Sequence, residues 1–240
     1  MIARTPPPIA AAMMREVYRR YFAARPDLFG VLLPDLLPHE VCGAAPPGRV
    51  KVLFLAESPP WVAGRHEVAV AADCRRPDYP YFWNDRYEAG ALRGPLAGGL
   101  AENLFYLLGL DGESRRENLA LFIEDGFFLV DTVKCIFRKN RKGVIPVDLV
   151  RLSAREILEA EIAALAPEYV VALGGTALSG LRMIEPYATA LAGAGTIIEV
   201  SREGLLEKPR LLCLPYPGWR NRQHQDLIES GFSTLRDLVA

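Results

Sequence analysis

Short, continuous apolar runs alternate with helical patterns along the chain. Such runs are typical of strands that are buried on both faces of a parallel sheet, and they occur at Val50–Leu55, Phe127–Val130, Tyr169–Leu173 and Leu211–Leu214. Thr196–Val200 is expected to form a further short strand. Helical spacing of apolar residues predicts helices at Ala10–Ala24, Gly98–Leu108, Asp148–Ala166, Thr176–Ile184 and Gln225–Val239. This alternation predicts an α/β fold with three layers, α/β/α, around a mainly parallel central sheet of four or five strands.

The length and hydrophobic content predict one core. The chain has 240 residues, half of them hydrophobic, so we expect a single domain over residues 1–240, with an N-terminal helix and a proline-rich lead-in over residues 1–48. No apolar run approaches the roughly 20 residues of a membrane span, and the N-terminus has no secretory core. We therefore expect a cytoplasmic monomer without a membrane partner.

Charge and cysteine content narrow the range of partners and cofactors. The 28 basic residues are balanced by 29 acidic residues, so a nucleic acid could be bound only by a local basic patch. The candidate patch, which could equally be a solvated basic turn, consists of Arg138, Lys139, Arg141 and Lys142. The four cysteines and three histidines lack the spacing of a metal site or an iron–sulfur cluster, so the sequence predicts no metal and no cofactor.

Two polar, proline-rich loops follow predicted strands that lie far apart in the chain. One is the segment from Ala56 to Pro60 after the first strand, and the other runs from Pro215 to Asn221 after the last strand. In open α/β sheets, ligands bind outside the carboxyl ends of the strands. The two loops are therefore candidates for the walls of one cleft, although ordinary strand-to-helix turns would also explain each of them. The turn Gly174-Gly175-Thr176 could present amides to an anion, or it could be a simple tight turn.

Four segments, in this order along the chain, resemble motifs of the uracil-DNA glycosylase superfamily. Phe54 to Pro60 is similar to a strand that ends in Gly-Glu-Ala-Pro-Gly, and Leu129 to Cys135 is similar to Ile-Thr-Asn-Val-Val-Lys-Cys. Glu161 to Gly174 resembles the helix and strand that follow in that family, and Tyr216 to Asn221 resembles His-Pro-Ser-Pro-Arg-Asn. The resemblance implies a DNA-binding protein that flips a damaged or deaminated base out of the helix and hydrolyses its N-glycosidic bond.

The resemblance also assigns roles to individual residues. Glu57 would position water and face the positive charge that develops on the sugar, and Tyr216 would be the second catalytic residue. The residues implied to bind the base are Ser58, Phe82 and Asp131, and those implied to bind DNA are Trp219, Arg220, Asn221, Arg138 and Arg141. Phe82 would stack on the base, but its aromatic cluster, Tyr81-Phe82-Trp83, could instead pack the long loop against the core.

The departures from the family motifs leave the activity open. Asp131 occupies the position of an asparagine that reads uracil, Tyr216 occupies that of a histidine, and only Cys135 matches a ligand of the family's iron–sulfur cluster. An ionised carboxylate only accepts hydrogen bonds, whereas an amide also donates them. Either the substrate is not plain uracil, or burial keeps Asp131 protonated. The alternatives to a glycosylase are an inactive nucleic-acid- or nucleotide-binding protein and an unrelated small-molecule enzyme.

Overall fold

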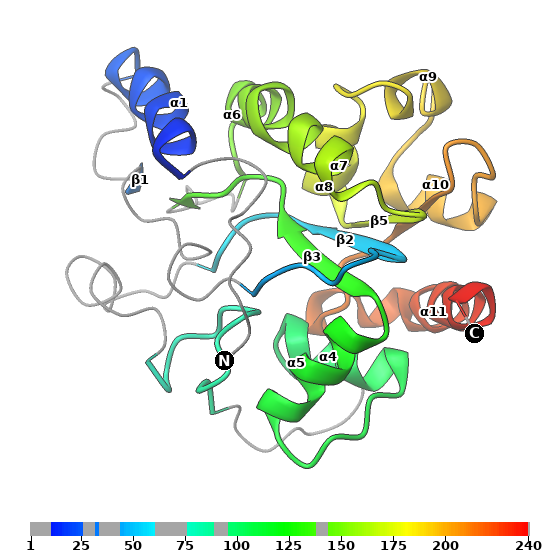
Figure 1. Ribbon diagram of the computed structural model, residues 1–240. Helices are drawn as coiled ribbons and strands as arrows, with labels where there is room; N and C mark the ends of the chain where they lie inside the picture. Colours follow the sequence, from blue (N-terminus) through cyan, green and yellow to red (C-terminus); the bar gives the residue numbers. More distant parts are fainter. Residues whose placement is uncertain are drawn as a thin grey trace.

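A four-stranded parallel sheet lies between two layers of helices (Figure 1). The computed structural model describes residues 11–25, 32–33, 44–60, 76–88, 96–137 and 144–239. The strands of the sheet are β2 (Val52–Ala56), β3 (Phe127–Asp131), β5 (Tyr169–Leu173) and β6 (Leu211–Leu214), in the order β3-β2-β5-β6. Neighbouring strands are all parallel. The predicted α/β fold class is therefore confirmed.

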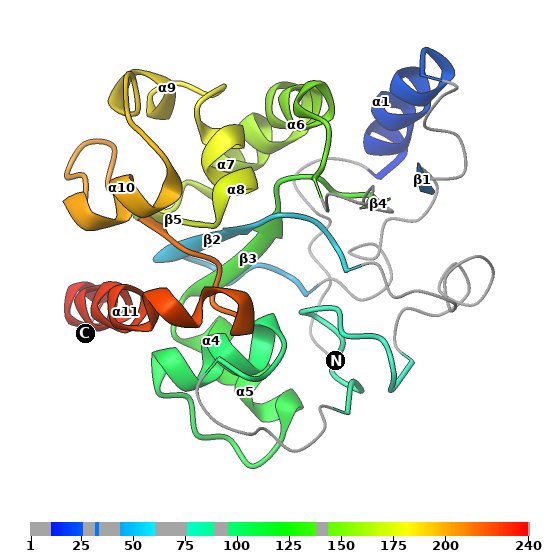
Figure 2. The ribbon, with the colours of Figure 1, turned by 180° about the vertical axis from the view of Figure 1, so that it is seen from behind.

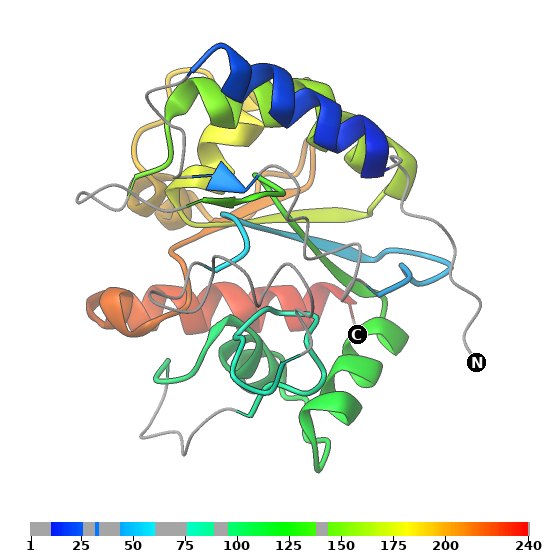
Figure 3. The ribbon, with the colours of Figure 1, turned by 90° about the vertical axis from the view of Figure 1, so that its left-hand side faces the viewer.

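The helices divide between the two faces of the sheet (Figures 1 and 3). One face is covered by α1 (Ala11–Ala23), α6 (Val147–Ser153), the π-helical turn η2 (Ala154–Leu158), α7 (Glu159–Leu165), α8 (Gly175–Leu181) and α9 (Tyr187–Ala190). The other face is covered by α4 (Leu100–Leu108), α5 (Arg115–Glu124) and α11 (Gln225–Val239). The helix α10 (Ile197–Glu203) packs beside β6 and α11. None of the helices in the described ranges combines the length and the apolar character that crossing a membrane requires.

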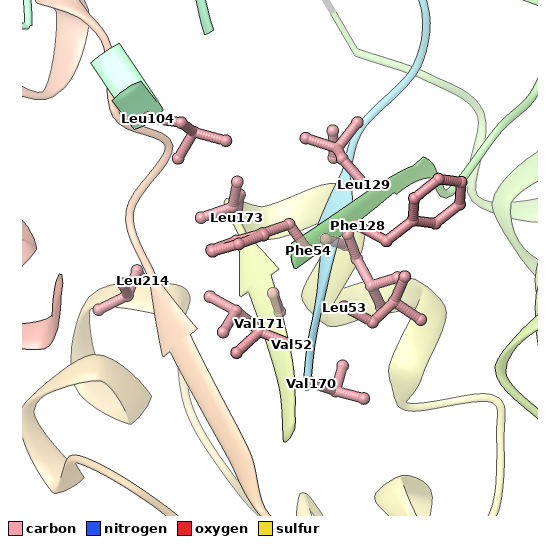
Figure 4. Packing of buried hydrophobic residues seen from close by; sticks show 14 of the residues in the cluster. Val52, Leu53, Phe54, Leu104, Phe128, Leu129, Val170, Val171, Leu173 and Leu214 are labelled. Carbon is pink, nitrogen blue, oxygen red and sulfur yellow. The ribbon is translucent and has the colours of Figure 1, made fainter. Parts of the chain in front are cut away.

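Apolar side chains on both faces of the sheet form the core. The β2 strand is buried along its whole length, and its Phe54 ring lies near Phe122 of α5, Phe127 of β3 and Phe232 of α11, with centroid distances of 5.7, 6.0 and 6.1 Å. Figure 4 shows side chains of neighbouring strands and of α4 gathered around Phe54. Burial on both faces explains why these strands have no alternation of polar and apolar residues.

Several features of the fold differ from the sequence-based expectations. The segment expected to be a strand at Thr196–Val200 begins α10, because the Thr196 side chain and Glu199 form a reciprocal capping box at its N-terminus. The helix expected over Asp148–Ala166 is interrupted by η2 between α6 and α7. The fold also contains a short antiparallel pair that was not predicted, β1 (Leu32–Leu33) with β4 (Ile136–Phe137).

Candidate active site

The carboxyl ends of the four strands bring the two candidate loops to the same edge of the sheet. Asp131, the last residue of β3, is paired with Ala56, the last residue of β2. The backbone N–H of Val133 donates a hydrogen bond of 3.0 Å to the carbonyl of Glu57. The second loop leaves β6, two strands from β2, and β5 lies between them. Figure 2 shows the segment after β6 leaving the sheet at the same end as the segments after β2 and β3.

Glu57 is half-buried immediately after β2. Its carboxylate oxygen Oε2 accepts a hydrogen bond of 2.6 Å from the hydroxyl of Thr176, in the first turn of α8. The neighbouring Ser58 is also half-buried, and its hydroxyl lies 3.4 Å from the carbonyl of Pro59. The first loop therefore holds a carboxylate at the sheet edge, in contact with the turn that follows β5.

Asp131 has an unusual environment for a carboxyl group, because only 7% of the residue is exposed. The pKa of Asp131 is raised to about 7, mainly by burial; Lys134 opposes this increase, and the negative charges of Glu161 and Glu57 add to it. Lys134 and Glu161 form an ion pair in which both side chains are buried. At neutral pH, a carboxyl group with a pKa near 7 is present in comparable amounts as the protonated form, which can donate a hydrogen bond, and as the ionised form, which only accepts one.

Tyr216 lies on the second loop with 38% of the residue exposed. Removal of its phenol from water raises the pKa of Tyr216 to about 12, and the charges of Glu57 and Asp131 make smaller contributions. Gly174, with a φ of 92°, lies against Tyr216: a Cβ atom at Gly174 would be 3.3 Å from the Cβ of Tyr216. Glu57 and Asp131 are therefore close enough to Tyr216 for their charges to act on its phenol.

The second loop is held by side-chain amides and exposes an aromatic residue. Asn221 donates a hydrogen bond of 2.8 Å to the carbonyl of Tyr216, and Asn103 of α4 donates one of 2.8 Å to the carbonyl of Pro217. Trp219 begins the 3-10 helix η3 (Trp219–His224), is 64% exposed, and has the guanidinium of Arg220 5.5 Å from its ring centroid. Asn221 thus uses its amide inside the loop, whereas Trp219 faces solvent.

Phe82 lies in the core. It is 4% exposed, and its ring contacts Trp83, Phe122 and Phe105 at centroid distances of 4.8, 5.2 and 6.1 Å. This position does not support the expected stacking role and favours the alternative, in which the aromatic cluster packs the loop against the core. Tyr81 of the same cluster is close enough to Asp131 that the aspartate charge adds to the effect of burial in raising the pKa of the Tyr81 phenol.

An internal ion pair that the sequence reading missed holds this aromatic loop. Arg115, at the start of α5, donates hydrogen bonds to the carbonyls of Tyr81, Phe82 and Asn84 at 2.8, 2.9 and 2.7 Å. It also forms an ion pair with Glu102 of α4, and both side chains are nearly buried. The chain carries no local signal for this arrangement, because the donor and acceptors are about 30 residues apart.

The remaining predicted site residues lie outside the part of the chain that the structure describes. These are Arg138 and Arg141, with the rest of the basic patch. Within the described ranges, no group of three or more histidine, cysteine or acidic side chains is placed to hold a metal ion. Cys135 and Cys213 are buried free thiols.

Comparison with known proteins agrees with this geometry. The family model described as the Uracil DNA glycosylase superfamily matches residues 42–237. A search of curated proteins found no match to the chain. The family match includes all four strands of the parallel sheet and both loops at its carboxyl edge. The resemblance seen in the sequence is thereby confirmed, and the chain belongs to the uracil DNA glycosylase superfamily.

Proposed function

We propose that the protein is a DNA glycosylase that hydrolyses the N-glycosidic bond of a damaged or deaminated base. The observation that carries this proposal is the placement of Glu57, Asp131 and Tyr216 at the carboxyl edge of one sheet, where Glu57 is bonded to the turn against which Tyr216 lies. Each residue comes from the end of a different strand. Family membership supports the same reaction class, although a fold by itself does not determine an activity.

Glu57 would orient the attacking water. In the reaction, the bond between the sugar C1′ and the base nitrogen breaks, and its electron pair leaves with the base. The water oxygen bonds to C1′, and its proton ends on the departing base by way of Glu57. A carboxylate stabilises the positive charge that develops on the sugar before the water adds. The hydrogen bond from Thr176 holds Glu57 beside the other two residues.

Asp131 would read the edge of the flipped base. Because its pKa is about 7, the protonated form can donate to a carbonyl oxygen at neutral or acidic pH, while the ionised form accepts from a base N–H. A protonated Asp131 can therefore replace the asparagine amide that the family uses at this position. Oxidised purines and deaminated bases offer carbonyl oxygens together with N–H groups, which makes them suitable partners for either form.

Trp219 and Arg220 would contact the DNA. An exposed indole can stack on bases, and a guanidinium can bind phosphates. Tyr216 lies between this exposed part of the loop and the two acids, so we place it against the flipped nucleotide. Ser58, beside Glu57, would add a hydroxyl at the same edge.

A panel of DNA substrates tests the proposal. Stoichiometric protein is incubated with single strands and duplexes that carry uracil, hypoxanthine, xanthine or a mismatch, and abasic product is measured by alkaline cleavage. Product from at least one substrate, formed much more slowly but still measurably by Glu57→Gln under single-turnover conditions, would support the proposal. If DNA is bound but no substrate yields an abasic site, the glycosylase proposal is wrong.

A second function is favoured by one specific observation. The family asparagine and histidine are replaced by Asp131 and Tyr216, and a neutral phenol cannot supply the positive charge of a protonated histidine. The protein would then bind a flipped or single-stranded nucleotide without cleaving it. Salt-dependent retention of the DNA panel with every substrate intact would identify this function.

A further inference from the structure

The turn after β5 separates Glu57 from Tyr216. Gly174 lies against Tyr216, and two residues later the Thr176 hydroxyl donates to Oε2 of Glu57 at 2.6 Å. We propose that Thr176 is a positioning residue that holds the Glu57 carboxylate in the orientation needed to direct water. This inference rests on the role proposed above for Glu57.

Thr176 is suited to this task by its own rigid attachment. The backbone of the turn is tied to the sheet, because the N–H of Gly174 donates to the carbonyl of Leu214 at 2.8 Å. The N–H of Leu178 then donates to the carbonyl of Gly174 at 3.2 Å. A threonine in a helix is restricted mainly to two χ1 rotamers, so the hydroxyl of Thr176 has few positions available relative to the sheet, and the observed one bonds to Glu57.

A hydrogen bond from Thr176 limits the orientations that the Glu57 side chain can adopt. The long glutamate side chain has several rotamers, and ordering it costs conformational entropy. A half-buried glutamate at the edge of the sheet would otherwise sample orientations that do not direct water toward C1′. Small displacements of a reacting group can reduce a rate by about two orders of magnitude. A single short hydrogen bond across the sheet edge therefore has a clear functional consequence.

Packing of this helix does not depend on the Thr176 hydroxyl. Ala177 and Leu178 supply the buried apolar contacts of the first turn, whereas Thr176 is only half-buried. Thr176→Val retains the branched shape and removes the donor, and Thr176→Ser restores the donor on a smaller side chain. Ser179, on the same helix, donates its hydroxyl to the carbonyl of Gly175 and offers a matched control, Ser179→Ala.

The experiment compares single-turnover base release and DNA affinity across these variants. With the best substrate of the panel, Thr176→Val should reduce the rate by about 10- to 100-fold without changing DNA affinity, and Thr176→Ser should recover most of the rate. Ser179→Ala should match the wild type. The double variant Glu57→Gln/Thr176→Val should be no slower than Glu57→Gln alone, since both changes act through one carboxylate. A Thr176→Val enzyme as fast as the wild type, or additive losses in the double variant, would overturn the inference.

The outcome for Glu57 separates this inference from the proposed function. If Glu57→Gln is as fast as the wild type, the proposed function of Glu57 fails. If Glu57→Gln is strongly slowed but Thr176→Val is as fast as the wild type, only the positioning role fails. The ¹³C carboxyl signal of Glu57, assigned by its absence in Glu57→Gln, provides a test that needs no activity. The signal should move in Thr176→Val and return in Thr176→Ser, and an unmoved signal in Thr176→Val would contradict the inference.

Discussion

Asp131 is paired with Ala56 across β3 and β2, which places it at the same end of the sheet as Glu57, and the charge of Glu57 contributes to the raised pKa of Asp131. Two acidic side chains at neighbouring strand ends interact unfavourably when both are ionised. Asp131 is the more buried of the two, and its pKa is raised to about 7. The two acids therefore differ in environment: Glu57 is half-buried, whereas Asp131 is buried and able to hold a proton near neutral pH.

The first prediction concerns the pH dependence of base reading. Below pH 7 Asp131 is mostly protonated and can donate to a base carbonyl, and this donor is lost as the pH rises through about 7. Excision of uracil should therefore decrease about tenfold per pH unit above this value in the wild type. Asp131→Asn should remove this decrease and raise uracil excision most at pH 8–9. Single-turnover rates between pH 5.5 and 9 measure both effects.

The raised pKa of Asp131 also makes the free energy of unfolding depend on pH. An unfolded aspartate has a pKa near 3.9, so the folded protein binds this proton more tightly, and the free energy of unfolding contributed by Asp131 decreases as pH rises from about 4 to about 7. Asp131→Asn should flatten that part of the curve in urea unfolding. Identical pH profiles of rate and stability in the two proteins would contradict a buried, proton-holding Asp131.

The second prediction concerns the buried ion pair of Lys134 and Glu161. Glu161→Gln removes the negative partner and leaves a buried ammonium group, so it should reduce the free energy of unfolding by about 3–5 kcal/mol. Glu16→Gln provides the control, because the Glu16–Arg20 pair on α1 is largely exposed and should contribute less than about 1 kcal/mol. Urea unfolding measures both. If the two variants lose the same free energy of unfolding, Lys134 is not held in a buried ion pair with Glu161.

Removing the charge of Glu161 should also lower the pKa of Asp131. Glu161 raises the pKa of Asp131, while Lys134 lowers it, so Glu161→Gln should move the pH transition of uracil excision toward acid. A transition that moves toward alkaline pH would mean that Lys134 loses its charge together with its partner.

The third prediction compares two adjacent arginines of α5. Arg115 donates to three carbonyls of the aromatic loop and pairs with Glu102, whereas the exposed Arg116 pairs with Asp85 at 2.9 Å. Arg115→Ala should release residues 76–88, seen as faster amide exchange there, and lower the free energy of unfolding by about 3 kcal/mol or more. Arg116→Ala should change it by less than about 1 kcal/mol. Comparable exchange in both variants would argue against the role of Arg115.

The fourth prediction concerns the exposed tryptophan of the second loop. Trp219→Ala should leave stability almost unchanged, since the side chain is 64% exposed, but should weaken DNA binding by about 1–3 kcal/mol through lost stacking. Tyr106 of α4 is 60% exposed, and Tyr106→Ala is the matched aromatic control. Fluorescence anisotropy at one fixed salt concentration measures the affinities. Equal effects of the two variants would remove Trp219 from the proposed DNA contact.

The elements that sequence analysis missed share a physical cause. α5 buries few apolar residues, mainly Leu119 and Phe122, so it has no apolar stripe to detect. Its N-terminus is marked instead by Ser114, whose side chain accepts a hydrogen bond from the N–H of Glu117. Thr196 and Glu199 mark α10 in the same way, but the β-branched run that follows favoured a strand. Capping chemistry was the better local signal in both cases.

The candidate site was only partly predictable. Glu57 and Asp131 could be found because each directly follows or ends a buried apolar run, and parallel strands end at one edge. Thr176 and Arg115 could not be assigned their partners, because these contacts join residues 119 and about 30 positions apart. For Phe82 the sequence left stacking and core packing open for a related reason: a cluster of aromatic residues does not reveal which ring points into the core.

The four parallel strands, the α/β class and the placement of two polar loops after strands could be predicted from the sequence, because continuous apolar runs that alternate with helical patterns are typical of a parallel sheet covered by helices on both faces. Tertiary structure alone decided which side chains meet at the sheet edge and in which protonation state. Strand order places the turn after β5 between Glu57 and Tyr216, and burial raises the pKa of Asp131 to about 7. Both depend on neighbours that are distant in the chain, and no local pattern encodes them.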